Sequence, residues 1–100
     1  MGGWDPYTGP SVYSVNLGGA TLERDFVMGG SGSGFIYGYA DANYKKGMSF
    51  EEAKKFCLNA VSLAMKRDGS SGGIIRLANI TEKGIEKEYH EYKTLPYQSV

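Results

Sequence analysis

The sequence is poor in the features that mark secreted, membrane-bound and nucleic-acid-binding proteins. One cysteine among 100 residues cannot form a disulfide within the chain, so we expect a reducing, intracellular compartment. No apolar run approaches the roughly 20 residues that a membrane-spanning helix needs, and residues 1–5 show no pattern of a secretion signal. Eleven basic side chains balance eleven acidic ones, so the charge favours neither nucleic acid nor an anionic membrane as a partner.

Glycine and aromatic residues are abundant instead. The 15 glycines follow no regular period, which excludes collagen-like and solenoid repeats. Eight Tyr, four Phe and one Trp are too many for a disordered tail. The length allows one domain at most.

Two stretches near the start of the chain have the alternation of β-strands. Residues 11–17 and 20–28 each place apolar side chains at alternate positions, with Arg24 as an interruption in the second stretch. These are Tyr13, Val15 and Leu17 in the first stretch, and Ala20, Leu22, Phe26 and Met28 in the second. Gly18 and Gly19 lie between them and can adopt the positive φ of a two-residue turn. The pattern predicts an antiparallel hairpin with one buried face.

A helix is predicted over residues 35–46. Ile36, Ala40 and Tyr44 recur at the four-residue spacing of one helix face. Gly38 in its middle costs about 1 kcal/mol relative to alanine, so we expect it to allow close approach of a neighbouring element. Gly47 is expected to end the helix.

A second helix is predicted from Ser49 to about Arg67. Ser49 and Glu52 have the spacing of a capping box, in which each side chain binds the other residue's backbone N–H. One apolar stripe follows, formed by Ala53, Cys57, Ala60, Val61 and Ala64. We expect Cys57 to be a core residue on this stripe, not a nucleophile.

Two further strands are predicted over residues 74–80 and 85–92. The element order is then strand, strand, helix, helix, strand, strand, which suggests one four-stranded sheet with two helices on one face. Ile74, Ile75 and Leu77 point to both sides of that sheet. Something outside this sequence is therefore expected to cover the second face.

Taken alone, the two glycine-rich loops carry weak chemical signals. Residues 29–34 follow a strand and open a helix, as a phosphate-binding loop does. They lack the P-loop and dinucleotide spacings, so a tight turn is the default and a small nucleotide-binding domain is a minor hypothesis. Asp68, Ser70 and Ser71 fit a polar helix end. The single histidine, His90, lies between charged residues and is expected to be solvated.

Two longer motifs in these loops change that assessment. Residues 30–41 read GSGSGFIYGYAD, and residues 67–73 read RDGSSGG. Together with Gly3-Trp4-Asp5 and the Gly18-Gly19 turn, they resemble the β subunits of the 20S proteasome core from Gly2 to about Tyr89. The aromatic FIYGY run resembles the caspase-like class, which cleaves after acidic residues.

The resemblance implies an α+β fold, the C-terminal half of the N-terminal-nucleophile sandwich, in which two sheets lie between two helical layers. Residues 1–100 are then a partial β-subunit domain, and the missing half would cover the open sheet face. The family's nucleophilic threonine and assisting lysine have no counterpart in this sequence. By motif, Ser31, Asp68 and Ser71 take the places of side chains that surround that threonine.

The resemblance also implies partners and a location. The expected partners are the other α and β subunits of the 20S particle and polypeptide substrates, in the cytoplasm and nucleus. No nucleic acid, membrane or cofactor is expected. No metal site is expected either, although backbone carbonyls near Met65, Asp68 and Ser71 leave cation binding open. Because the chain lacks the nucleophile, we expect it to be inactive alone. A non-catalytic assembly or interaction protein of the same fold is the alternative.

Overall fold

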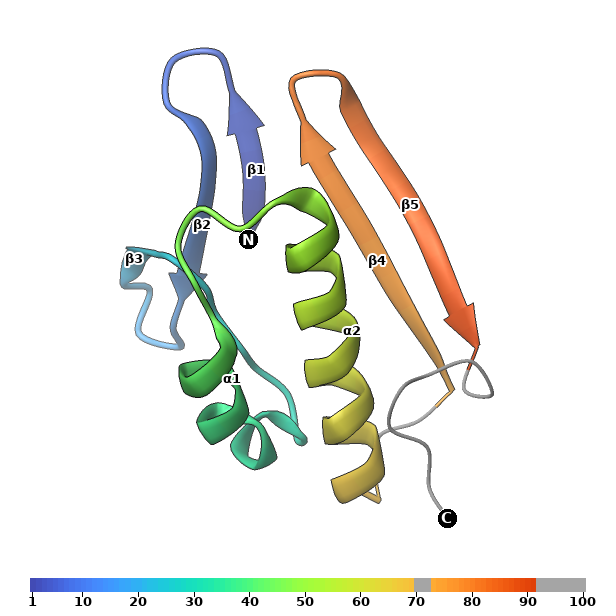
Figure 1. The fold of residues 1–100 in the computed structure, drawn as a ribbon. Coiled ribbons are helices and arrows are strands. Elements are labelled where there is room, and N and C mark those ends of the chain that lie inside the picture. The colour runs from blue at the N-terminus through green and yellow to red at the C-terminus, as the bar shows by residue number, and fades with distance from the viewer. Residues whose placement is uncertain (70–72, 92–100) are drawn as a thin grey trace. The chain divides into compact units, whose positions relative to one another are not determined.

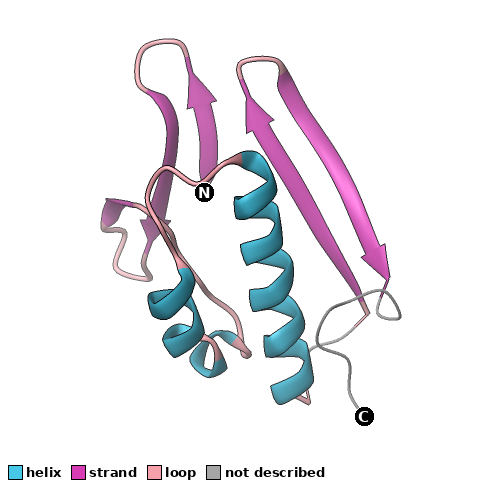
Figure 2. Cartoon of the chain, in the orientation of Figure 1, coloured by secondary structure: helices cyan, strands magenta, loops and turns pink. Residues whose placement is uncertain are grey.

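The computed structural model describes residues 1–69 and 73–91 and shows five strands and three helical segments in this part of the chain (Figures 1 and 2). The chain divides into two compact units, Met1–Met28 with Ala78–Lys87, and Gly29–Leu77 with the residues from Glu88 onward. Ser71, Tyr92 and the tail that contains Pro96 lie outside the described residues. Within the described residues, no helix combines the length and the apolar character needed to cross a membrane.

The first unit contains an antiparallel sheet in the order β1-β2-β3. Its strands are β1 (Gly2–Asp5), β2 (Gly9–Val15) and β3 (Thr21–Arg24). Strand β1 was not predicted, because GGWD has no alternating pattern. Strand β1 forms because its backbone pairs with β2. The pairing runs from Gly2 opposite Val12 to Asp5 opposite Gly9.

The predicted β2–β3 hairpin is confirmed, but β3 ends at Arg24 instead of Met28, and the turn is longer than expected. Val15 pairs with Thr21, and the backbone of Asn16 donates to the carbonyl of Ala20 at 3.1 Å. Gly19 N–H donates to the Asn16 carbonyl at 3.0 Å, and Gly19 has φ of 86°. This is a three-residue loop in which a turn is followed by one left-handed glycine. The prediction of a two-residue Gly-Gly turn was therefore wrong.

The prediction that this hairpin has one buried apolar face is wrong: Tyr13, Phe26 and Met28 are half-buried, and the other apolar side chains of the predicted face are exposed. Val15 and Leu22 expose 54% and 50% of their surface, and Leu17 is also exposed. None of the buried apolar side chains among the described residues lies in this unit.

The register pairs Val15 with Thr21 and Ser14 with Leu22, so Val15 and Leu22 lie on opposite faces of the hairpin. The three-residue loop shifts the pairing by one residue from the predicted one, and such a shift turns one strand's apolar set to the other face.

In the second unit, the first predicted helix is shorter and divided. A 3-10 turn, η1 (Ser33–Phe35), precedes α1 (Tyr37–Asn43), with Ile36 between them outside the helical region at φ −121° and ψ 6°. Helix α1 ends at Asn43, so Gly47 does not terminate it; Gly47 instead turns the following loop at φ 82°. Among residues 1–69 and 73–91, no atom lies within 4 Å of a methyl group added to Gly38, so these residues do not make the expected close approach.

Helix α2 (Phe50–Arg67) is confirmed at both ends. The Ser49 hydroxyl accepts from the N–H of Glu52 at 3.2 Å, and Glu52 accepts from the N–H of Ser49 at 3.2 Å. Lys66 and Arg67 lie in the last turn, where positive charge complements the helix dipole.

The core of the second unit is built mainly from small side chains. Its buried apolar residues are Ile36, Ala40, Ala60, Ala64 and Ile75. The Phe56 ring stacks on Tyr39 of α1, with ring centres 6.0 Å apart, and lies 6.1 Å from the Tyr44 ring. Alanines on both helices therefore leave room for an aromatic contact between α1 and α2.

The last two strands, β4 (Ile74–Thr81) and β5 (Gly84–Glu91), form their own two-stranded sheet. The described strands thus form two sheets, and the predicted single sheet of four strands is wrong. The predicted order of elements is confirmed, with β1 added in front. Ile75 is buried and Ile74 is 44% exposed, as expected for a strand with apolar side chains on both faces.

Candidate functional site

The first side of the candidate site is the loop that leads into η1. Gly30 has φ of 94°, in the left-handed region that glycine tolerates, and its carbonyl accepts from the N–H and the hydroxyl of Ser33 at 3.2 and 2.9 Å. The Phe35 N–H donates to the carbonyl of Gly32, which is a buried residue. These bonds shape the loop around Ser31, whose hydroxyl takes no part in them.

The second side of the site is the end of α2. Asp68 follows the last helical residue and has extended backbone angles, and its N–H still donates to the Ala64 carbonyl at 2.8 Å. This bond to the last turn of the helix fixes the position of Asp68. Asp68 is half-buried.

Within the part of the chain that the structure describes, a side-chain hydrogen bond joins the two sides. The Ser31 hydroxyl donates to Oδ2 of Asp68 at 2.6 Å, across 37 positions of sequence. The predicted approach of Ser31 and Asp68 is confirmed. Ser71, the third residue of the predicted set, lies outside the described residues. A hydroxyl that donates its proton to a carboxylate keeps two lone pairs, so this pair is suited to accept from an amine.

A hollow of about 400 Å³ lies beside Ser31. Ser31 and the rest of the loop from Gly29 to Ser33 line one side of it. The remaining lining is mainly apolar: Ile36, Val61, Ala64, Met65 and Ile74. Ser31 thus lies on the polar side of an open hollow whose other side is apolar, and a few polar groups beside apolar side chains are common in ligand sites.

Other chemistries find little support in the described residues. A phosphate cradle needs a loop that opens directly into an α-helix, whereas this loop opens into a three-residue 3-10 turn. No group of three or more His, Cys, Asp or Glu side chains in residues 1–69 and 73–91 has the arrangement of a metal site. The cation binding left open near Met65 and Asp68 is not tested by these residues.

Two predictions about single side chains were wrong. Cys57 is exposed and is not a core residue, although atoms packed around its sulfur raise the pKa of the thiol by desolvation. The position of Cys57 on the apolar stripe was correct, but the described residues do not cover that part of the stripe. The His90 side chain is 23% exposed, and its Nε2 is shielded from solvent without a hydrogen-bond partner. Its charged sequence neighbours had suggested a fully solvated ring.

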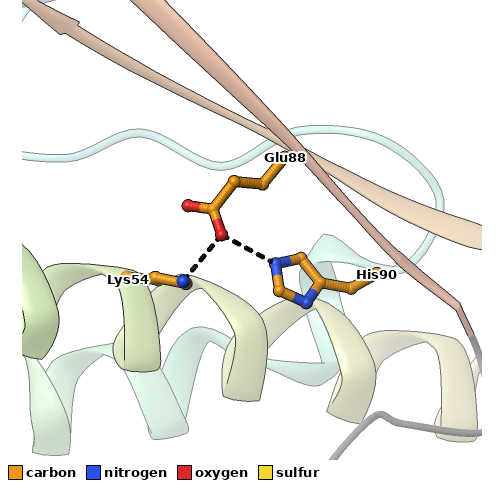
Figure 3. Close-up of polar contacts among 3 residues, drawn as sticks. All are labelled: Lys54, Glu88 and His90. Carbon is orange, nitrogen blue, oxygen red and sulfur yellow. Dashed lines mark ion pairs between the residues drawn. The ribbon is translucent and has the colours of Figure 1, made fainter.

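His90 belongs to a cluster that the sequence did not reveal. Glu88 Oε1 lies 2.6 Å from Nζ of Lys54 and 3.6 Å from Nε2 of His90 (Figure 3). The hydrogen bond from Lys54 holds the pKa of Glu88 below its ordinary value, and the same bond raises the pKa of Lys54. The spacing of Glu88 and His90 places them on one face of β5, but nothing in the sequence connects them to α2.

Comparisons with known proteins agree on one family. A family model described as "Proteasome subunit" matches residues 1–80. The chain is 57% identical over 84 residues to "Proteasome subunit beta type-6-B like protein" of Salmo salar, covering 84% of this chain and 39% of that protein. It is 46% identical over 96 residues to "Proteasome subunit beta type-6" of Dictyostelium discoideum, covering 96% of this chain and 45% of that protein. It is 54% identical over 86 residues to "Proteasome subunit beta type-9" of Bos taurus, covering 86% of this chain and 39% of that protein. The chain therefore spans less than half the length of these relatives.

Proposed function

The chain belongs to the proteasome subunit family, and from this premise we propose that it is the part of a β subunit that orients a catalytic threonine. The threonine and its assisting lysine would come from sequence that precedes this region in the relatives. Residues 1–100 would then be a partial β-subunit domain, and the whole protein a threonine-type endopeptidase.

The hydrogen bond between Ser31 and Asp68 carries this proposal. An N-terminal threonine uses its own amine as the base that removes the hydroxyl proton, so that amine must be held in place. The Ser31 oxygen offers lone pairs to an amine, and the Asp68 carboxylate favours the positive charge that the amine gains. Two loops distant in sequence supply these groups at one point.

The hollow beside Ser31 supports the same proposal. Its apolar side chains would limit the contact of water with an amine held at Ser31, and electrostatic interactions are stronger where water is reduced. We assign Ser71 to the same group of supporting side chains on its place in the RDGSSGG motif.

The finer features follow from the same membership. Cleavage after acidic residues is proposed on the FIYGY resemblance and on relatives named β type-6. The proposed partners are the other α and β subunits of the 20S particle and polypeptide substrates, in the cytoplasm and nucleus. This chain alone is expected to have no peptidase activity.

The test is a pair of substitutions in the subunit as it occurs in the particle. Ser31→Ala and Asp68→Asn should each reduce hydrolysis of a fluorogenic peptide with Glu before the scissile bond. A misplaced reacting group costs on the order of 10²-fold, and we expect the loss mainly in kcat. The effects of the two substitutions should not add, because they remove one shared hydrogen bond.

Ser14→Ala is the matched control. Ser14 lies in β2, outside both loops of the site, and does not line the hollow. It should leave the cleavage rate close to that of the unaltered particle. If Ser31→Ala and Asp68→Asn particles assemble and cleave as fast as the control, the supporting role is wrong and the alternative, a non-catalytic assembly protein, is favoured.

A further inference from the structure

A second serine lies in the loop that carries Ser31, and the proposed function gives it no role. Ser33 follows Ser31 by two residues, is half-buried and also lines the hollow. Its hydroxyl donates to the Gly30 carbonyl at 2.9 Å, which is a bond within the loop. Any effect of this hydroxyl on the site therefore passes through the backbone of the loop.

The bonds to Gly30 close a turn that has Ser31 at its centre. The Ser33 N–H donates to the Gly30 carbonyl at 3.2 Å, which is the bond that closes a four-residue turn around Ser31 and Gly32. Gly32 has φ of −87° and ψ of −5°, the angles of the third residue in a type I turn. The turn therefore fixes the backbone at Ser31 and, with it, the direction in which the Ser31 side chain leaves the chain.

The Ser33 hydroxyl adds a second and shorter bond to the same carbonyl. The N–H bond of 3.2 Å is at the long end of the usual range, whereas the hydroxyl oxygen lies 2.9 Å from the carbonyl oxygen. One carbonyl oxygen has two lone pairs and can accept both bonds. Removal of the hydroxyl would leave the turn closed by the longer bond alone.

Ser33 also joins this turn to the core of the second unit. Its carbonyl accepts from the N–H of Ile36 at 3.1 Å, and Ile36 is 6% exposed. Ser33 thus bonds backward to Gly30 and forward to a buried residue. Loss of the hydroxyl should release the Gly30 end of the turn while the Ile36 end stays in place, so the unit should still fold.

The hydrogen bond from Ser31 to Asp68 is sensitive to such a release. It spans 2.6 Å, and hydrogen bonds weaken as the donor and acceptor separate or lose alignment. Asp68 is held by its own bond to the Ala64 carbonyl at the end of α2, which does not involve the loop. The position of Ser31 is therefore the part of this contact that depends on the turn.

We propose that Ser33 is a positioning residue, whose hydroxyl holds the turn in the form that keeps Ser31 on Asp68. The inference rests on the proposed function, because it takes the Ser31–Asp68 pair as the support of the threonine amine. Ser33 itself touches no reacting group. It acts through the Gly30 carbonyl and the backbone of Ser31.

The test is Ser33→Ala in the subunit as it occurs in the particle, with the fluorogenic Glu peptide as substrate. We expect kcat to fall about two- to tenfold, the range that corresponds to the loss of one neutral hydrogen bond. KM should stay unchanged, because the lost orientation matters in the chemical step. Ser14→Ala, in β2, is the control and should change neither constant. An unchanged kcat in assembled Ser33→Ala particles would overturn the proposal.

Rescue by Ser33→Thr separates the hydroxyl from a merely structural role of the side chain. Threonine keeps the hydroxyl, and the hollow beside Ser33 has room for the added methyl group. Ser33→Thr should therefore restore kcat to nearly that of the unaltered particle. A loss in Ser33→Thr as large as that in Ser33→Ala would overturn the proposal.

Ser31→Ala distinguishes a failure of this inference from a failure of the proposed function. Ser33→Ala should cause no further loss in a Ser31→Ala particle, because both changes act on one contact. A further loss of the same size would overturn the positioning role. If Ser31→Ala lowers kcat and Ser33→Ala does not, the positioning role is wrong and the proposed function stands. If Ser31→Ala has no effect, the proposed function is wrong and the positioning role falls with it.

Gly30→Ala tests the same turn from the accepting side, and it decides the question should Ser33→Ala particles not assemble. Gly30 has φ of 94°, which alanine adopts poorly, although the added methyl group would meet none of the described atoms within 4 Å. Gly30→Ala should lower kcat with KM unchanged, as Ser33→Ala does. Full kcat in Gly30→Ala particles would overturn the proposal.

Discussion

At the scale of single residues, Asp5 shows how one carboxylate closes a turn. Its Oδ1 accepts from the N–H groups of Tyr7 and Thr8 at 2.8 and 2.9 Å, and its Oδ2 accepts from the Thr8 hydroxyl. These hydrogen bonds lower the pKa of Asp5. The bond from the Thr8 side chain has the largest effect, and the two backbone bonds have smaller ones. These bonds span three residues at most, and they position β1 to pair with β2.

The first prediction concerns the pH dependence of this turn. Because the folded pKa is lowered, the stabilisation is complete above the ordinary pKa of aspartate and is lost as the pH falls through the folded value. In a pH titration by NMR, the Tyr7 and Thr8 amide signals should therefore move with a midpoint below the ordinary aspartate range. Asp5→Asn should abolish that movement, and a midpoint at or above the ordinary range would contradict the bonding described here.

Single residues were also where sequence reasoning was least reliable. The motifs identified Ser31 and Asp68, because glycine-rich loops at helix ends bring hydroxyl and carboxylate groups to defined positions. Cys57 and His90 were misjudged, because exposure depends on which element covers a residue and not on its sequence neighbours. The partnership of Lys54 with Glu88 depends on a contact between α2 and β5 that no local pattern encodes.

At the scale of elements, α2 is the one predicted most accurately. Its start signal is local: Ser49 and Glu52 satisfy each other's backbone groups within one turn. Strand β1 and the split between η1 and α1 were not predicted, because neither has a local start signal of this kind. Their form depends on pairing with β2 in one case and on the backbone at Ile36 in the other.

The second prediction concerns the cap of α2. Ser49→Ala should destabilise the start of α2 by about 1 kcal/mol. This loss corresponds to a roughly fivefold reduction in the protection of the first-turn amides against hydrogen exchange. The pKa of Glu52 is lowered, mainly by the hydrogen bond from the Ser49 N–H and to a smaller extent by the Ser49 side chain. The contribution of Glu52 is therefore present above the ordinary glutamate pKa and is lost as the pH falls through the folded value. Hydrogen exchange measures the effect; Lys55→Ala, on the exposed helix surface, is the control and should change little.

At the scale of the whole molecule, the described residues bury little apolar surface. Three of the five buried apolar side chains are alanines, and large side chains such as Val15, Leu22 and Ile85 remain exposed. Burial of apolar surface stabilises a fold by roughly 25 cal/mol per Å². Because few large side chains are buried, this contribution gives only weak support to a unique packed state. The sequence had indicated this through apolar residues on both faces of β4.

The third prediction follows from this thin core. The purified 100-residue chain should show a broad thermal transition, or associate, instead of unfolding sharply as a monomer. Calorimetry together with sedimentation measures both properties. A sharp, concentration-independent monomeric transition would contradict this expectation and show that the described elements are sufficient for cooperative folding.

The central claim is that this chain works as part of a proteasome β subunit. The most direct test is to purify 20S particles from the source cells and identify their subunits by intact mass and peptide mass spectrometry. The account predicts peptides spanning residues 30–41 and 67–73 within the particle, in amounts equal to those of the other β subunits. Recovery of these peptides only from fractions far smaller than the particle would contradict it.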